Sequence, residues 1–172
     1  MDIRMKWTST RSALAVASAV AVVSSIVVVA SPAASAAPHH RTLTFMASDP
    51  VGGVNDGGNP GSTSGDVRTY SLKLSTTAGA KVGRANIVMI QTFRDAGIDT
   101  VLQTSVLTIP GGAITCQGIL HFSDMTDMKQ RPLDKVTTIA ITGGTGKYVG
   151  ADGYVTFEIL PNFASKWVVH LI

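Results

Sequence analysis

A glycine-rich stretch near the C-terminus is the first place where residue types and spacing suggest chemistry. Residues 139–153 read IAITGGTGKYVGADG and hold five glycines and Lys147 directly after a β-branched run. Glycine-rich loops that end in lysine cradle phosphates in nucleotide-binding proteins. The Walker pattern fails here, because Ile141 stands where its first glycine is required and Tyr148 replaces the hydroxyl residue. The dinucleotide fingerprint fails as well, since Val149 takes the place of its third glycine, and the stretch favours a structural turn.

Two carboxylates are the weak candidates for acid-base catalysis. Glu158 is the sole glutamate of the chain and lies between Phe157 and Ile159. If its strand face pointed into a core, desolvation would raise its pKa and suit it to proton transfer. The opposite face is the better core, which favours a solvated Glu158. Asp49 follows the first expected strand and is favoured as a turn former.

Four neutral polar residues are candidates to orient a bound molecule through hydrogen bonds: Gln91, Gln103, Gln117 and Tyr154. Each lies in a segment that reads as a strand, so each points either into the protein or into solvent. The sequence does not decide between the two faces. These residues are therefore predicted ligand contacts only if their faces look inward.

The metal-ligating and thiol residues predict no metal site and no cofactor. His121, Asp124 and Asp127 are spaced i, i+3, i+6, which would serve a metal only on a helix, and His121 reads as strand. Cys116 is the only cysteine, so no intramolecular disulfide forms. Because it lies in an alternating apolar run, Cys116 is favoured as a small buried hydrophobe rather than a nucleophile.

The first 36 residues read as a secretory signal peptide. Basic residues precede the apolar run 13–30, and Ala34-Ser35-Ala36 supplies a small-x-small cleavage pattern, so the mature chain is expected to begin at Ala37 and to be secreted. A retained membrane anchor over residues 12–30 is the alternative, since that run approaches the length that spans a bilayer. After cleavage no stable membrane anchor is expected.

Residues 37–172 are expected to form a single domain, because 136 residues suit one domain better than two. The whole chain carries a net charge of +3, and removal of residues 1–36 takes away three basic residues and one acidic residue. The mature chain then has eleven basic and ten acidic residues, a net charge of +1. This balance leaves no electrostatic footprint for nucleic acid or an anionic membrane surface.

The mature chain is rich in β-branched and aromatic runs separated by glycine, proline, asparagine and aspartate, the pattern of strands and turns. Eight strands are expected, at 41–47, 66–75, 83–93, 99–109, 112–122, 136–142, 153–160 and 166–172. A flexible glycine-rich loop is expected at 48–65, and helix only as a turn or two within 125–133 or 147–151. Short hairpin connections favour an all-β, closed eight-stranded antiparallel barrel, with a two-sheet sandwich as the runner-up.

Residues 140–160, AITGGTGKYVGADGYVTFEIL, resemble the signature of the allene oxide cyclase and dirigent protein superfamily, and FASKWVVHLI, GDVRTYSLKL and IVMIQTF resemble its other strands. The resemblance implies an eight-stranded barrel with a largely hydrophobic cavity and a homo-oligomer. The polar catalytic positions of the plant cyclases fall on apolar residues such as Leu72 and, approximately, Ile87. Asp152 stands where dirigent proteins usually carry arginine.

The sequence is compatible with two functions. The first is a secreted barrel that binds a small hydrophobic molecule and steers its cyclisation or stereoselective coupling, which would make any enzyme activity that of an isomerase or cyclase. The second is a non-catalytic secreted scaffold or interaction barrel. A cavity larger than solvent molecules supports the first, and a solidly filled interior with an exposed apolar patch supports the second.

Overall fold

The computed structural model describes residues 40–58 and 60–172, and the expected signal peptide lies outside the described residues. Its strands are β1 (Arg41–Asn55), β2 (Val67–Ser75), β3 (Lys81–Asp95), β4 (Ile98–Ile109), β5 (Gly112–Phe122), β6 (Val136–Gly144), β7 (Gly153–Ile159) and β8 (Ser165–Leu171). Two short 3₁₀ turns complete it, η1 (Gly146–Tyr148) and η2 (Pro161–Phe163). In this part of the chain no helix is long and apolar enough to cross a bilayer.

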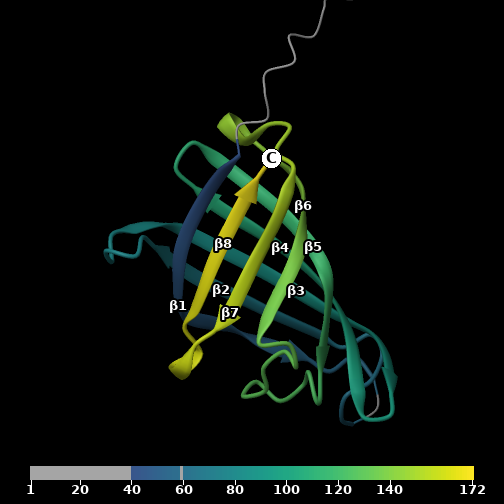
Figure 1. Cartoon of the computed structure of the whole chain (residues 1–172). Helices are drawn as coiled ribbons and strands as arrows, with labels where there is room; N and C mark the ends of the chain where they lie inside the picture. The colour runs from purple at the N-terminus through teal and green to yellow at the C-terminus, as the bar shows by residue number, and fades with distance from the viewer. Residues whose placement is uncertain (1–39, 59) are drawn as a thin grey trace, which may run out of the picture. The chain divides into compact units, whose positions relative to one another are not determined.

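The strands form a closed barrel in sequence order, with β1 returning to pair with β8 (Figure 1). Every neighbouring pair is antiparallel, and the closing seam places Phe45 opposite Trp167. Closure gives each strand two hydrogen-bonded neighbours and leaves no free edge. The predicted eight-stranded antiparallel barrel is confirmed, and the two-sheet sandwich is wrong.

Strand alternation divides the barrel into an apolar interior and a mixed outer surface. On β5, Cys116 and Leu120 are fully buried, whereas Gln117 and Ile119 are exposed. On β7 the buried residues include Phe157. The face that is the better core on each strand therefore looks into the barrel, as burial of apolar area requires.

β1 is longer than the sequence indicated. The expected loop at 48–65 is wrong for its first part, because pairing with β2 resumes at Val51 after a bulge and continues to Asn55. Gly52 explains the continuation, since a Cβ at this position would lie 1.8 Å from the carbonyl oxygen of Thr69 on β2. Only glycine allows the two backbones to approach so closely, and its presence disguised a strand as a loop.

The glycine-rich stretch forms the β6–β7 hairpin and packs on the β4–β5 turn at one end of the barrel (Figure 1). Its Thr145 and Lys147 amides donate to carbonyl oxygens of the β4–β5 hairpin at 2.8 Å, so they are not free to hold a phosphate. Gly146 has a φ of +60°, and a Cβ there would lie 2.2 Å from Gly111 O. Tyr148 is buried, and its hydroxyl donates to Pro110 O at 3.4 Å. The stretch is the structural turn that its spacing predicted.

Candidate functional site

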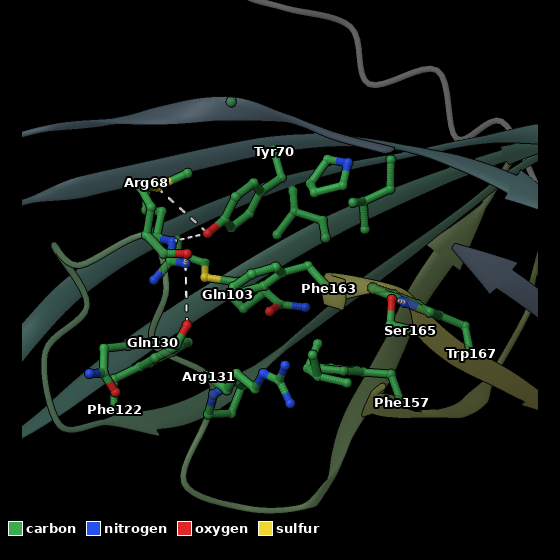
Figure 2. Close-up of a pocket in the computed structure, with 18 residues that line it drawn as sticks. Arg68, Tyr70, Gln103, Phe122, Gln130, Arg131, Phe157, Phe163, Ser165 and Trp167 are labelled. Carbon is green, nitrogen blue, oxygen red and sulfur yellow. Dashed lines mark hydrogen bonds between the residues drawn. The ribbon is translucent and has the colours of Figure 1, made fainter. Parts of the chain in front are cut away.

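A cavity of about 200 Å³ lies in the barrel, and residues of η2 and of the β5–β6 connection form part of its lining. Figure 2 shows side chains from several strands converging on it. Its lining consists of Pro50, Gly52, Arg68, Tyr70, Leu72, Ile87, Met89, Gln103, Phe122, Met128, Gln130, Arg131, Pro132, Phe157, Ile159, Phe163, Ser165 and Trp167. Most of these side chains are apolar, and the cavity is large enough for a molecule of one or two rings.

Aromatic rings are concentrated around this cavity although they make up only 6% of the chain. Five of them line it: Tyr70, Phe122, Phe157, Phe163 and Trp167. Phe157 and Trp167 stack at 4.9 Å with an interplanar angle of 16°, and the Trp167 indole donates to Ser165 Oγ at 2.8 Å. Rings held in this way present flat, preformed apolar surfaces to a ligand.

The β5–β6 connection forms one wall of the cavity and is held by the buried guanidinium of Arg68. Arg68 donates to four carbonyl oxygens, those of Met125 (3.1 Å), Asp127 (3.3 Å), Met128 (3.0 Å) and Gln130 (3.4 Å). Within residues 40–58 and 60–172 it forms no ion pair with a carboxylate. The connection has no helix where 125–133 was a candidate, so these four bonds take the place of regular secondary structure.

Two aromatic rings complete the surroundings of Arg68. Its guanidinium lies 4.9 Å from the Tyr70 ring centroid and 5.6 Å from that of Phe122. The Nε–H donates to the Tyr70 hydroxyl, which in turn lies 3.6 Å from Met128 Sδ. Burial raises the pKa of the Tyr70 phenol above its usual 10.0, against the opposing effect of the Arg68 charge and hydrogen bond. The phenol therefore stays protonated at physiological pH and keeps its hydroxyl hydrogen.

Gln103 contributes an amide group to the cavity lining (Figure 2). The side chain is fully buried, and its Nε2 donates to Ser105 Oγ at 2.9 Å. Among residues 40–58 and 60–172 its Oε1 has no hydrogen-bond partner. Of the four predicted ligand contacts, Gln103 is the one that the structure places on the cavity wall.

Gln91 also points inward but belongs to a separate buried network around Asp99. The Asp99 carboxylate accepts hydrogen bonds from Gln91 Nε2 (3.0 Å), Arg94 Nη1 (2.6 Å) and the Met125 amide (2.7 Å). The Ser62 hydroxyl bridges Asp99 Oδ2 at 2.5 Å and Gln91 Oε1 at 2.7 Å. This network attaches the β1–β2 connection and the β5–β6 connection to the same end of the barrel.

The other predicted site residues lie on the outer surface and do not line the cavity. Gln117 bonds Thr104 on the neighbouring strand, and Tyr154 stacks on His170 with centroids 4.4 Å apart. Neither lines the cavity, because each lies on the outward face of its strand, while the buried residues beside it lie on the inward face.

The two candidate acid-base residues also lie outside the lumen. Glu158 lies 3.6 Å from Lys135, and Asp49 pairs with Lys73 at 3.0 Å in an exposed ion pair. Asp49 has a φ of 52°, a left-handed conformation that suits the bulge before Val51. Their carboxylates therefore cannot transfer a proton to a molecule held inside the barrel.

The side chains that line the cavity determine what it can do chemically. Among the described lining residues none is Asp, Glu, His or Lys. Arg68 and Tyr70, which shape the wall, were missed by sequence reasoning. The sequence did contain one indication that Arg68 points inward. Arg68 falls on the same face of its strand as the apolar Leu72 and Leu74. The arrangement provides shape, aromatic surface, the unpaired buried Oε1 of Gln103 and the guanidinium of Arg131 over the Phe163 ring, with no carboxylate or imidazole among the described lining residues.

Cys116 lies inside the barrel and is fully buried, as its apolar surroundings predicted. Burial raises the pKa of its thiol to about 12. Because alkylation needs the thiolate, we expect iodoacetamide at pH 8 to leave the folded protein unlabelled and to modify it fully in urea. Mass spectrometry measures both states, and rapid labelling of the folded protein would contradict the buried placement.

The comparisons with solved structures agree with this fold. A pyocyanin demethylase superposes with a TM-score of 0.60 at 23% identity, and the match covers 77% of this chain and 100% of that chain. An exo-specific intermolecular Diels-Alderase, AbnU, gives 0.55 at 17% identity, covering 77% and 97%. The pterocarpan synthase dirigent protein GePTS1 gives 0.56 at 15% identity, covering 77% and 83%. At these identities the likeness shows a shared barrel fold.

Sequence comparison is more specific about the family. No curated protein matches the chain in sequence. The family described as "Allene oxide cyclase barrel like domain" matches residues 47–166, which run from within β1 to the start of β8. The chain therefore belongs to the allene oxide cyclase barrel-like domain family.

Proposed function

We propose that this protein is a secreted barrel that binds a small hydrophobic molecule in its lumen and steers cyclisation or stereoselective coupling of that molecule. The observation that carries the proposal is the aromatic-lined cavity of about 200 Å³ at one end of the barrel. A preformed apolar cavity of this kind binds by removing ligand surface from water and by offering a complementary shape.

Steering in such a cavity rests on positioning. Glu158 and Asp49 lie outside the lumen, so no carboxylate among the described lining residues is available for proton transfer. A cavity that holds the ligand in one reactive conformer accelerates the reaction and selects its stereochemistry, because the ligand loses its orientational entropy on binding rather than in the reaction step. Such positioning needs few polar groups. The names of two solved relatives, a Diels-Alderase and a dirigent protein, support the proposal by showing that this fold hosts such reactions.

The proposal is tested by filling the cavity. We expect prodan, a neutral fluorescent hydrophobic probe built on one two-ring naphthalene unit, to bind the purified protein saturably with increased emission. Leu72 lines the cavity from β2, and Leu72→Trp places extra ring atoms in it. This variant should weaken probe binding by about tenfold or more, since it occupies the space that the ligand needs.

The matched control is Ile119→Trp, which adds the same ring on the outer face of β5. We expect this variant to bind the probe as the unmodified protein does. Circular dichroism confirms that both variants remain folded. Equal binding by Leu72→Trp and Ile119→Trp would place the probe outside the lumen and overturn the proposal.

The scaffold alternative is favoured by one specific observation, an apolar row on the outside of the barrel. Val67, Ile90, Leu102 and Ile119 lie directly opposite one another across β2, β3, β4 and β5. Ile90 and Ile119 are 40% and 49% exposed. Such a row suits contact with a second copy of the chain, in line with the expected homo-oligomer. The alternative predicts no saturable binding of the probe, so the same titration separates the two functions.

Secretion is the remaining part of the proposal and rests on the N-terminal sequence pattern. We expect the protein recovered from culture medium to begin at Ala37, because signal peptidase cleaves after Ala34-Ser35-Ala36. N-terminal sequencing and intact mass measure the start directly. Recovery of a chain that begins at Met1 in the membrane fraction would support the retained anchor instead.

A further inference from the structure

The side-chain carbonyl of Gln103 is a polar group in the cavity lining that lacks a hydrogen-bond donor. In the described part of the chain two buried side-chain atoms lack a hydrogen-bond partner, Gln103 Oε1 and Thr137 Oγ1, and only Gln103 lines the cavity. An unpaired buried carbonyl costs about 1–3 kcal/mol, and proteins rarely retain one without a purpose. Gln103 therefore stands out as a group that a second molecule would complete.

The protein groups near the cavity do not supply the missing donor. Gln103 Nε2 donates one of its two N–H groups to Ser105 Oγ, and this bond holds the amide plane in place. The Arg68 guanidinium already donates to carbonyl oxygens of the β5–β6 connection and to the Tyr70 hydroxyl. The Trp167 indole N–H is bonded to Ser165. In the described part of the chain no lining side chain donates to Gln103 Oε1, and the guanidinium of the lining residue Arg131 lies over the Phe163 ring instead.

We propose that the ligand of this cavity is a flat, mainly apolar molecule that carries an O–H or N–H donor, and that Gln103 Oε1 accepts that hydrogen bond and selects for it. The proposal rests on the proposed function, since it names the chemical class that the same cavity takes. The flat shape follows from the ring surfaces that Phe157 and Trp167 present, and the donor follows from the unpaired carbonyl. A molecule of the same shape without a donor would leave the carbonyl desolvated and unpaired.

The test uses three two-ring probes that differ only in one substituent: 2-naphthol, 2-methoxynaphthalene and 2-methylnaphthalene. The first carries a donor, the second only an acceptor, and the third neither. The quantity to measure is the selectivity, the Kd of a comparison probe divided by the Kd of 2-naphthol. The cost of removing each probe from water is the same for every protein variant, so it cancels when selectivities are compared between variants.

Gln103→Met removes the carbonyl and keeps the side-chain length. We expect its selectivity for 2-naphthol over both comparison probes to fall about five- to tenfold from that of the unmodified protein. The matched control is Gln117→Met, which makes the same change on the outer face of β5. We expect Gln117→Met to leave the selectivity unchanged.

A second measurement needs no substitution. The chain contains four glutamines, at 91, 103, 117 and 130. With glutamine labelled by ¹³C at the side-chain carbonyl, 2-naphthol should shift the assigned Gln103 signal and 2-methylnaphthalene should shift it much less. Two results would overturn this inference and leave the proposed function standing. In the first, all three probes bind saturably and Gln103→Met has the same selectivity as the unmodified protein. In the second, 2-naphthol and 2-methylnaphthalene shift the Gln103 signal equally. Failure of every probe to bind would overturn the proposed function itself.

Discussion

Replacing Arg68 with methionine is expected to lower the free energy of unfolding by roughly 3 kcal/mol and to abolish ligand binding in the lumen. Arg68 is 3% exposed and donates to four carbonyl oxygens of the β5–β6 connection. Methionine fills similar space but donates nothing, so these carbonyl groups lose their partners. The wall that they form would then detach from the barrel, and the cavity would lose one side.

Urea unfolding measures the loss of stability, and hydrogen exchange of the amides in 123–135 reports the detachment of the connection. Arg68→Lys should restore little, because an ammonium group has three donors at one point and cannot span four carbonyl oxygens. Arg84→Met is the matched control, since Arg84 is exposed on β3 and its guanidinium donates to Ser71 Oγ rather than to the β5–β6 connection. Equal stability of Arg68→Met and Arg84→Met would show that the four hydrogen bonds do not hold the wall.

Replacing Asp99 with asparagine is expected to lower the free energy of unfolding by roughly 2–4 kcal/mol. The fully buried carboxylate accepts hydrogen bonds from the Gln91 amide, the Arg94 guanidinium, the Met125 backbone and the Ser62 hydroxyl. An asparagine has one acceptor oxygen, and its NH₂ would face donors. It would also leave the Arg94 charge without its partner.

The two connections that meet at Asp99 should loosen together in this variant. Protection of the Met125 amide and of the segment 61–65 from hydrogen exchange should fall in parallel, because Asp99 bonds both Met125 and Ser62. Asp95→Asn is the matched control, since Asp95 is an exposed residue near the end of β3. Loss of protection in only one of the two connections would show that Asp99 does not couple them.

Much of the fold was predictable because strand patterns are local. β5 was predicted to the residue, Gly112–Phe122, since Pro110 and glycines mark its start and alternation continues to its end. β1 was cut short because Gly52 reads as loop, and only its close approach to β2 explains the glycine. Helix within 125–133 was an open expectation that the structure does not bear out, because Arg68, distant in sequence, supplies the bonds that hold this segment.

The candidate site was less predictable, because lumen and surface positions alternate along strands that are apolar on both faces. On β4, Val101 and Leu107 are buried, while Leu102 and Val106 lie on the other face and are equally apolar. The sequence therefore did not separate Gln103, which lines the cavity, from Gln117, which does not. It also held no sign that the Asp99 carboxylate would be shared by two connections.

The sequence by itself determined that the chain makes eight strands and that the glycine-rich stretch is a turn, since periodicity and turn residues act over a few positions. It favoured a closed barrel over a sandwich, and the pairing of β1 with β8 in the tertiary structure decided between them. The tertiary structure alone decided which polar groups face the lumen and which of them stay unpaired. Such a partner can be distant in the chain: Arg68 bonds Met128 and Gln130, which lie 60 and 62 residues further along the sequence. Hydrogen bonds of that range depend on barrel closure, and closure leaves Gln103 Oε1 as a free acceptor inside.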